Sequence, residues 1–366
     1  MKSLVWLRSD LRIDDNPALR HACINYDEVH CIYIYSPEQM KIHNEANCKI
    51  EFIISNLRHL ADSLKKINIP LTILRSDGFS DNANKILDIV NERSISRVNW
   101  NNMFGADENN RDKEVKNILS KNNIEFESFD DQVVYSPGTI KTKEDKPYSV
   151  FTPFKRRWIE NFNLDSLDIE FNYSSKKNSG INSNIYEFNF EFEKSHSVDM
   201  SLWKIGEANA ISILHDYLDK KVLRYSKDRN DPIIEGTSRL SPYLASGIIS
   251  SKRCILEALK INNFQLDSGE TGIVKWIDEI IWREFYKNIM HSFPKVSKGL
   301  PFQDYTRKIK WRFDKDEFES WKVGNTGFPI IDSAMRQLNA EGWMHNRLRM
   351  VVAMFFTKNM LHDWRL

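Results

Sequence analysis

A run of polar side chains past the middle of the chain has the residue types of a phosphate-binding segment. Three hydroxyls and one guanidinium lie within five residues, Thr237-Ser238-Arg239-Leu240-Ser241, just ahead of an apolar helical stretch. Hydroxyl and guanidinium donors near the start of a helix suit the oxygens of a phosphate. The alternative is a helix N-cap beside a surface arginine. On these residues alone both interpretations stand.

A second polar cluster lies along a predicted helix at residues 274–290. Its carboxylate, indole, guanidinium and phenol recur every three or four residues and share one helical face, made of Glu279, Trp282, Arg283 and Tyr286. Aromatic faces stack on nucleobases while neighbouring polar groups hydrogen-bond to the base edges. The alternative is an aromatic core stripe, in which Glu279 and Arg283 would need partners because unpaired buried charges are costly.

The segment at residues 342–350 supplies a third cluster. An amide, a cation and a thioether fall on one helical face at Asn346, Arg349 and Met350, a combination that suits a partly polar pocket. His345 stands beside them without a second histidine or cysteine at metal-ligand spacing. We therefore expect a structural histidine there and no metal site.

Alternating strands and helices in the first 130 residues would form the scaffold. Four short runs rich in Val, Ile, Tyr and Trp predict strands, namely Leu4–Leu7, His30–Tyr35, Leu71–Leu74 and Val98–Asn101. Apolar residues at helical spacing predict helices over Cys48–Ile67 and Asp81–Arg93. This alternation predicts an α/β fold with a doubly wound parallel sheet, Rossmann-like in order. No G-x-G-x-x-G or P-loop glycine pattern follows any of these strands.

The rest of the chain divides into a connector and a helical part. Several prolines and an Asn- and Ser-rich stretch at residues 172–189 are typical of a linker. Helical spacing is clearest over Ser250–Leu259, Val274–Met290, Pro329–Asn339 and Asn346–Leu361. We therefore expect an α/β domain over residues 1–131, a linker over 132–200 and an all-helical domain over 201–366.

The composition is that of a globular protein. The 366 residues are 41% hydrophobic and 28% charged, and no apolar run is long enough to cross a membrane. The net charge of +1 hides an asymmetry, because residues 201–366 hold 26 basic against 20 acidic side chains and residues 1–200 hold 26 against 31. A basic second half favours a polyanionic partner. Four cysteines without paired spacing indicate neither a zinc site nor disulfides, and we expect a cytoplasmic protein.

Six strings, spread from residue 4 to residue 349, match one known family in that family's order. They are Leu4–Arg12 (LVWLRSDLR), Val150–Phe154 (VFTPF), Glu235–Ser241 (EGTSRLS), Trp282–Tyr286 (WREFY), Thr326–Pro329 (TGFP) and Gly342–Arg349 (GWMHNRLR). On these strings the sequence resembles the DNA photolyase/cryptochrome family, and within it the bacterial class I cyclobutane pyrimidine dimer photolyases. The resemblance implies an α/β antenna domain followed by a helical domain that binds FAD and DNA.

The resemblance also assigns roles to the three clusters and their neighbours. The positions implied at FAD are Tyr225, Thr237, Ser238, Arg239, Leu240, Ser241, Trp276, Asn346 and Arg349. The positions implied to hold a flipped-out pyrimidine dimer are Glu279, Trp282, Asn346 and Met350. The positions implied to contact DNA are Arg229, Glu279, Trp282, Arg283, Tyr286, Asn346 and Arg347. Trp311 and Trp364 match two members of the family's electron-transferring tryptophan chain.

The activity implied by the resemblance is light-dependent repair of cyclobutane pyrimidine dimers in UV-damaged DNA. In the family, excited reduced FAD passes an electron to the dimer, whose ring then splits. Methionine at Met350 cannot donate a proton, which favours this substrate over (6-4) photoproducts, for which the family places a histidine there. The alternatives are a cryptochrome-type blue-light flavoprotein without repair activity and a truncated remnant that binds flavin poorly, because relatives continue past the position of Trp364.

A second chromophore and a monomeric state complete these expectations. The resemblance implies 5,10-methenyltetrahydrofolate as an antenna between the domains, at His43, Asp107, Glu108 and Lys298. Asp107 stands where such relatives usually show an amide, so one donor is lost and one charge is gained.

Overall fold

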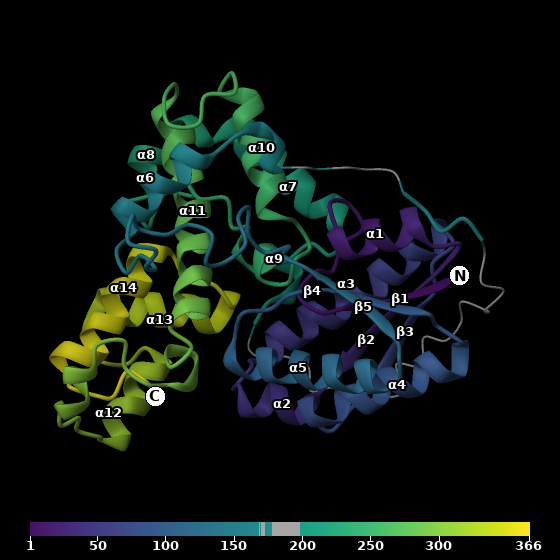
Figure 1. Ribbon diagram of the computed structural model, residues 1–366. Coiled ribbons are helices and arrows are strands. Elements are labelled where there is room, and N and C mark those ends of the chain that lie inside the picture. The colour runs from purple at the N-terminus through teal and green to yellow at the C-terminus, as the bar shows by residue number, and fades with distance from the viewer. Residues whose placement is uncertain (168, 170–172, 178–197) are drawn as a thin grey trace.

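The computed structural model describes residues 1–167, 169, 173–177 and 198–366, and among these it forms a five-stranded parallel sheet followed by a mainly helical half (Figure 1). The predicted fold class is therefore confirmed. Most of the Asn- and Ser-rich part of the predicted linker lies outside the described residues. The two boundaries between the α/β domain, the linker and the helical domain stay a prediction.

The sheet has the order β3-β2-β1-β4-β5, and every neighbouring pair is parallel. Its strands are β1 (Lys2–Leu7), β2 (Glu28–Tyr35), β3 (Leu71–Arg75), β4 (Arg97–Asn101) and β5 (Glu125–Phe129). The four predicted strands are confirmed. The fifth was not predicted, because a short edge strand that alternates Glu and Ser with Phe carries a weak apolar signal.

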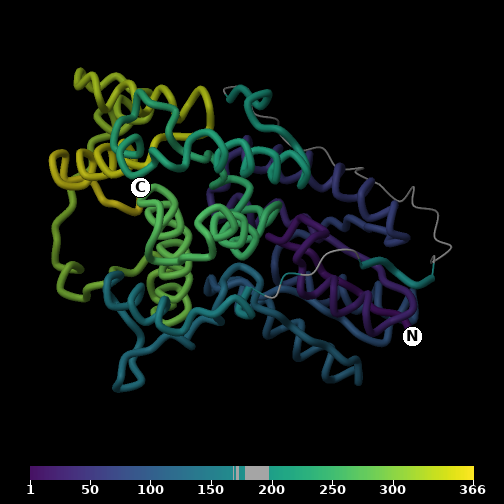
Figure 2. Tube along the Cα trace, turned by 90° about the horizontal axis from the view of Figure 1, so that it is seen from above, coloured from purple at the N-terminus to yellow at the C-terminus, as the bar shows by residue number. Residues whose placement is uncertain are grey.

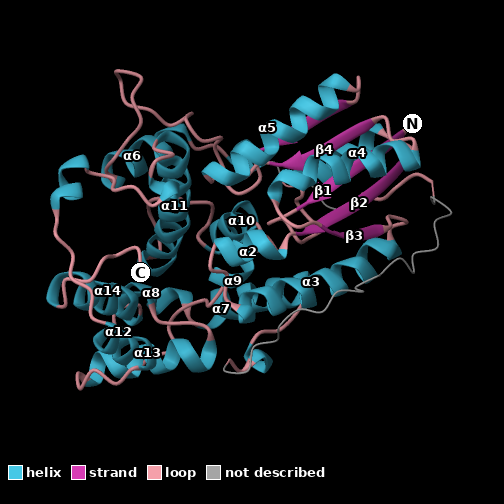
Figure 3. Cartoon of the chain, turned by 90° about the horizontal axis from the view of Figure 1, so that it is seen from below, coloured by secondary structure: helices cyan, strands magenta, loops and turns pink. Residues whose placement is uncertain are grey.

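Helices cover both faces of the sheet (Figure 3). They are α1 (Pro17–Asn25), α2 (Pro37–Ile42), α3 (Asn47–Lys66), α4 (Asn82–Arg93) and α5 (Ala106–Lys121). Side chains alternate along β1, so Val5 and Leu7 join the core under α1 and α3. Leu4 and Trp6 join the opposite core under α4 and α5. Both helices predicted for this half, α3 and α4, are confirmed.

The second half is built from helices of very different length. They are α7 (Glu207–Lys220), α8 (Tyr225–Asp228), α9 (Ser241–Ala245), α10 (Ser251–Ile261), α11 (Thr271–Ser292), α12 (Lys315–Val323), α13 (Pro329–Glu341) and α14 (Asn346–Met354). The four helical segments predicted here are confirmed, with a π-helical turn at Phe355–Asn359 continuing α14. Within the predicted linker, α6 (Phe151–Asn161) buries Phe154 and Trp158 and contacts α11.

The two halves are packed as one body (Figure 2). Arg12 is buried at their junction, where it pairs with Asp131 and donates to the Gly247 carbonyl oxygen at 3.0 Å. Gly247 has φ +65°, and a Cβ there would lie 2.0 Å from the Ser9 carbonyl oxygen, so only glycine permits this approach. The α/β half therefore holds the helical half in a fixed position. No helix in the described part of the chain is long and apolar enough to span a membrane.

Candidate functional site

The three polar clusters found in the sequence meet at one cavity between the helical half and the α/β half. The cavity has a volume of about 810 Å³, within the range of small-molecule sites. It is bounded by α8, by the loop that leads into α9, by α11 and by the turn before α14, and residues of the α/β half, among them Glu45, Lys49 and Glu108, also line it. Every position implied at FAD lines it, namely Tyr225, Thr237, Ser238, Arg239, Leu240, Ser241, Trp276, Asn346 and Arg349.

Helix α11 presents one polar face to this cavity. Trp276, Glu279 and Arg283 follow one another at three and four residues and all line it. Trp276 is 3% exposed, and its indole N–H donates to Ser238 Oγ at 3.4 Å. The Arg283 guanidinium donates to the Gln132 carbonyl oxygen and, at 3.1 Å, to the Leu244 carbonyl oxygen. The polar face is thus tied to its surroundings on both sides of the cavity.

The other aromatic residues of α11 lie beside α6. The Trp282 indole is stacked on the Phe151 ring, with 3.6 Å between centroids and 10° between planes. The Tyr286 ring stacks against Trp282, with 5.7 Å between centroids, and Tyr286 is exposed. Met350, on α14, is 51% exposed. Of the positions implied to hold a dimer, Glu279 and Asn346 line the cavity, whereas Trp282 and Met350 lie outside its lining.

The donor-rich loop, Thr237–Ser241, offers unpaired hydroxyls and one guanidinium to the cavity. Arg239 adopts the left-handed region at φ +51°, pairs with Glu341 at 3.2 Å and lies 4.5 Å over the Trp343 ring. The hydroxyls of Thr237 and Ser241 make no hydrogen bond to any residue in the described part of the chain. These donors are therefore available to a group bound in the cavity.

Two of the arginines implied to contact DNA stand at the same edge of the cavity. Arg229 pairs with Glu279 at 2.6 Å, and its guanidinium lies 5.2 Å from the Tyr225 ring. Arg347 donates through Nε and Nη2 to Asn230 Oδ1 at 3.1 and 2.7 Å. Because Arg347 has a neutral partner, its positive charge is not compensated by this contact.

Comparison with known proteins decides the family. The family model described as DNA photolyase matches residues 3–171, and the model described as FAD binding domain of DNA photolyase matches residues 276–366. The chain is 35% identical over 363 residues to the deoxyribodipyrimidine photo-lyase of Escherichia coli strain K12, and the match covers 99% of this chain and 76% of that protein. The chain belongs to the photolyase/cryptochrome family.

Solved photolyase structures have the same fold. A class III photolyase from Agrobacterium tumefaciens superimposes with a TM-score of 0.81 at 29% identity, covering 100% of this chain and 74% of that one. An archaeal photolyase from Sulfolobus tokodaii, described as holding two FAD molecules, superimposes with a TM-score of 0.78 at 25% identity and covers 100% of this chain and 77% of its own.

The cavity of this photolyase-family chain fits FAD by its own chemistry. Free hydroxyls and Arg239 suit a pyrophosphate, the Trp276 and Trp343 rings suit flat ring systems, and the cavity is large enough for an extended ligand. Two further polar groups line the cavity, and of these Lys287 was not singled out in the sequence. Lys287 follows Arg283 by four residues, and burial lowers its pKa to about 8. His345 is buried, and burial lowers its pKa as well.

Helix α11 also carries a buried carboxylate on the side away from the cavity. Glu284 is 2% exposed and accepts hydrogen bonds from Val134 N at 2.7 Å, Tyr135 N at 3.1 Å and Trp158 Nε1 at 2.7 Å. Burial raises the pKa of this carboxyl to about 7. The position of Glu284 in the sequence did not predict that it is a buried acceptor, because its three donors come from distant segments of the chain.

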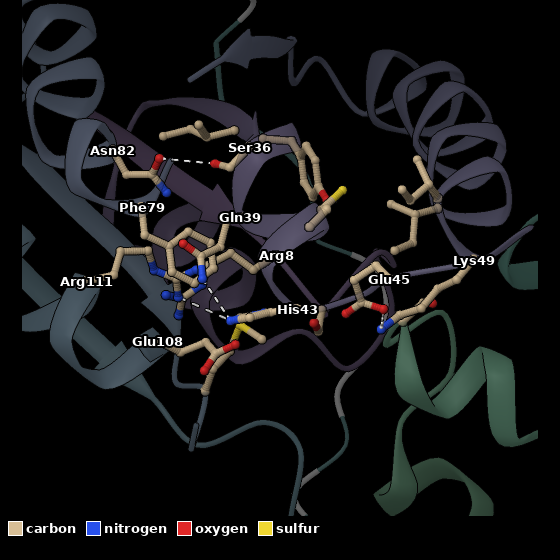
Figure 4. Close-up of a pocket in the computed structure, with 18 of the residues that line it drawn as sticks. Arg8, Ser36, Gln39, His43, Glu45, Lys49, Phe79, Asn82, Glu108 and Arg111 are labelled. Atoms are coloured by element: carbon tan, nitrogen blue, oxygen red, sulfur yellow. Dashed lines mark hydrogen bonds and ion pairs between the residues drawn. The ribbon is translucent and has the colours of Figure 1, made fainter. Parts of the chain in front are cut away.

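Of the residues implied at a second chromophore, His43 and Glu108 line one pocket of the α/β half (Figure 4). His43 Nε2 lies 3.1 Å from Asp107 Oδ2 and 2.8 Å from Gln39 Nε2. His43 and Glu108 line a pocket of about 150 Å³ beside Arg111, whose guanidinium lies between the Trp6 and Phe79 rings. The short turn Val296–Lys298 is joined to the start of α5, where Ala106 N donates to Ser297 Oγ at 3.1 Å. This contact brings the turn of Lys298 close to Asp107 and Glu108.

The two tryptophans that the resemblance assigns to an electron-transfer chain lie in neighbouring segments. Arg312 N donates to the Leu361 carbonyl oxygen at 3.0 Å, and Arg312 pairs with His362. Trp311 and Trp364 each lie within two residues of this pairing and are partly exposed. Among the described residues, no group of three or more His, Cys, Asp or Glu side chains could hold a metal ion.

Proposed function

We propose that this chain is a light-dependent deoxyribodipyrimidine photo-lyase that uses FAD to repair cyclobutane pyrimidine dimers in DNA. The observation that carries the proposal is the convergence of free hydroxyls, guanidinium groups and an indole from distant segments on one cavity of about 810 Å³. The supporting relative of that name is 35% identical. When bound, reduced FAD supplies the light-driven electron that splits the cyclobutane ring.

The chain's own residues would hold and orient the cofactor. The hydroxyls of Thr237, Ser238 and Ser241, with Arg239 and Tyr225, would donate to the phosphate and ribityl oxygens, and all five residues line the cavity. Trp276 would pack against the rings, and its hydrogen bond to Ser238 fixes the indole plane. Asn346 and Arg349 would bind on the opposite wall, from the first turn of α14. These groups bind and orient and take no part in bond breaking.

The dimer would enter from the open side of α11. Trp282 offers a stacking face whose orientation is set by Phe151, and aromatic stacking contributes about 1–3 kcal/mol for a base. Glu279 and Asn346 would hydrogen-bond to the pyrimidine edges. Met350 supplies polarizable contact but no proton, which agrees with ring splitting by electron transfer alone.

DNA binding would rest on the cations around this opening. Arg229 and Arg347 would neutralise DNA phosphates, and Arg283 and Tyr286 would add contacts from α11. Trp311 and Trp364 would carry electrons inward from the surface.

A folate antenna is the finer part of the proposal. We place 5,10-methenyltetrahydrofolate beside His43, Asp107, Glu108 and Lys298, in the junction between the halves. Asp107→Asn restores an amide donor and removes one negative charge, so more folate should co-purify with the variant than with the wild-type chain. Equal folate content in the variant and the wild-type chain, measured by absorption after denaturation, would contradict the proposal that Asp107 lies at the folate site.

The experiment that tests the proposed dimer site compares binding to duplexes with and without one thymine dimer. Trp282→Ala should weaken binding to the damaged duplex about tenfold or more and leave the undamaged duplex almost unaffected, because only an extruded base stacks on the indole. Trp282→Phe keeps an aromatic face and serves as the matched control. An equal loss on both duplexes would make Trp282 a packing residue and contradict the proposal for it.

A further inference from the structure

His345 stands at the start of α14 in a geometry that fixes its tautomer. Its Nδ1 caps the helix by accepting a hydrogen bond from the backbone N–H of Arg347 at 3.2 Å. An accepting nitrogen carries no proton, so in the neutral ring the proton is on Nε2. Burial, with the cations Arg347 and Arg229 nearby, lowers the pKa of His345 and keeps the ring neutral. Asp231 is the acidic group that opposes this effect.

The Nε2–H of His345 has no acceptor. The side chain is 2% exposed, and Nε2 is buried without a hydrogen-bond partner among the residues that the structure describes. Nearly all buried donors in folded proteins are paired, because an unpaired one keeps the cost of its lost hydration. The same residue lines the cavity of about 810 Å³. An acceptor atom on a molecule bound in the cavity would therefore supply the hydrogen-bond partner that His345 Nε2 lacks in the protein alone.

The position of His345 favours the cofactor over DNA as the source of that acceptor. Asn346 and Met350, one and five residues further on, are exposed on the open side of α14, whereas His345 is buried. Its ring lies 6.3 Å from the Trp343 ring at 90°, and Trp343 in turn packs under Arg239 of the donor-rich loop. His345 therefore lies on the buried side of the cavity, next to Trp343 and the donor-rich loop.

We propose that His345 is a positioning residue that donates its Nε2–H to an acceptor of the bound flavin nucleotide, a phosphate or carbonyl oxygen or a ring nitrogen, while its Nδ1 caps α14. The inference rests on the proposed function, because it requires that FAD occupies this cavity. It assigns two separate tasks to the two nitrogens of one ring, and the tasks can be separated by substitution.

The test uses the full chain freed of flavin and titrated with FAD, with binding followed by quenching of flavin fluorescence. His345→Asn keeps an oxygen where Nδ1 caps the helix but lacks a group at the position of Nε2. It should bind FAD about tenfold more weakly, while the Tm of the flavin-free protein stays unchanged. His345→Gln keeps an amide N–H near the position of Nε2 and loses the cap. It should bind FAD within about threefold of wild type while its Tm falls.

His215→Asn, at a half-exposed histidine that faces Glu257, is the control and should change neither quantity. Wild-type affinity in His345→Asn would overturn the inference and leave the proposed function standing. Normal FAD affinity with loss of discrimination between damaged and undamaged DNA would overturn it in favour of a DNA contact. A wild-type chain that binds no FAD would instead contradict the proposed function, and this inference with it.

Discussion

Replacing Glu284 should destabilise the whole junction between the linker and α11. The carboxylate accepts from Val134 N, Tyr135 N and the indole of Trp158, a side chain with no exposed surface. Each buried donor left without an acceptor costs about 1–3 kcal/mol. Water can reach the two partly buried backbone groups but not the indole. We therefore expect Glu284→Ala to lower the free energy of unfolding by about 1–3 kcal/mol.

Urea unfolding followed by circular dichroism measures this loss directly. Glu160→Gln is the matched control, since Glu160 lies on α6, is exposed and pairs with Arg157 at 3.1 Å. Its effect should stay within about 0.5 kcal/mol. A loss below about 1 kcal/mol in Glu284→Ala would refute the reasoning, because it would mean that the three donors find other acceptors in the folded state.

Three further predictions concern Glu284, Phe151 and Arg347. The pKa of Glu284 is raised to about 7 in the folded state, so the folded chain binds this proton more tightly than the unfolded chain. The free energy of unfolding should therefore fall as pH rises from about 4.5 to 7, by at most about 1.4 kcal/mol per pH unit. Glu284→Gln should reduce this dependence of stability on pH, and denaturant midpoints that depend on pH as in the wild-type chain would contradict the prediction. Phe151→Ala should weaken binding to dimer-containing DNA about threefold to tenfold more than binding to undamaged DNA, with Phe162→Ala, which loses a ring stacked on Trp158, as the control. Arg347→Gln should weaken binding to both duplexes alike and reduce the slope of log affinity against log salt by about 0.9; an unchanged slope would show that Arg347 contacts no phosphate.

The strands and long helices were predictable because each one carries its own local signal. Leu71–Leu74 is a short β-rich run, and Cys48–Ile67 shows one apolar stripe, so both could be assigned without tertiary information. Strand β5 escaped because the edge of a sheet tolerates exposed glutamates. Helix α1 escaped although Asn16-Pro17 is a recognisable start, with the Asn16 side chain accepting from Leu19 N.

The site was predictable only in part, for a physical reason. Glu279 and Arg283 share a helical face, and helical spacing alone places them together. Glu284 and His345 could not be assigned in this way, because their roles depend on burial and on partners from other segments. His345 was expected to be a structural histidine, and its cap on α14 confirms that one nitrogen has such a role. The unpartnered second nitrogen becomes visible only once the cavity is formed.

The most direct test of the central claim is the light-dependent loss of thymine dimers from a UV-irradiated oligonucleotide. The purified chain, loaded with FAD and chemically reduced, is mixed with the oligonucleotide, and half of the sample is kept in the dark. The account predicts that blue light restores intact thymines, that the dark sample keeps its dimers, and that Trp282→Ala slows the restoration. Bound, reduced FAD without any loss of dimers in blue light would contradict repair and leave a flavoprotein of cryptochrome type.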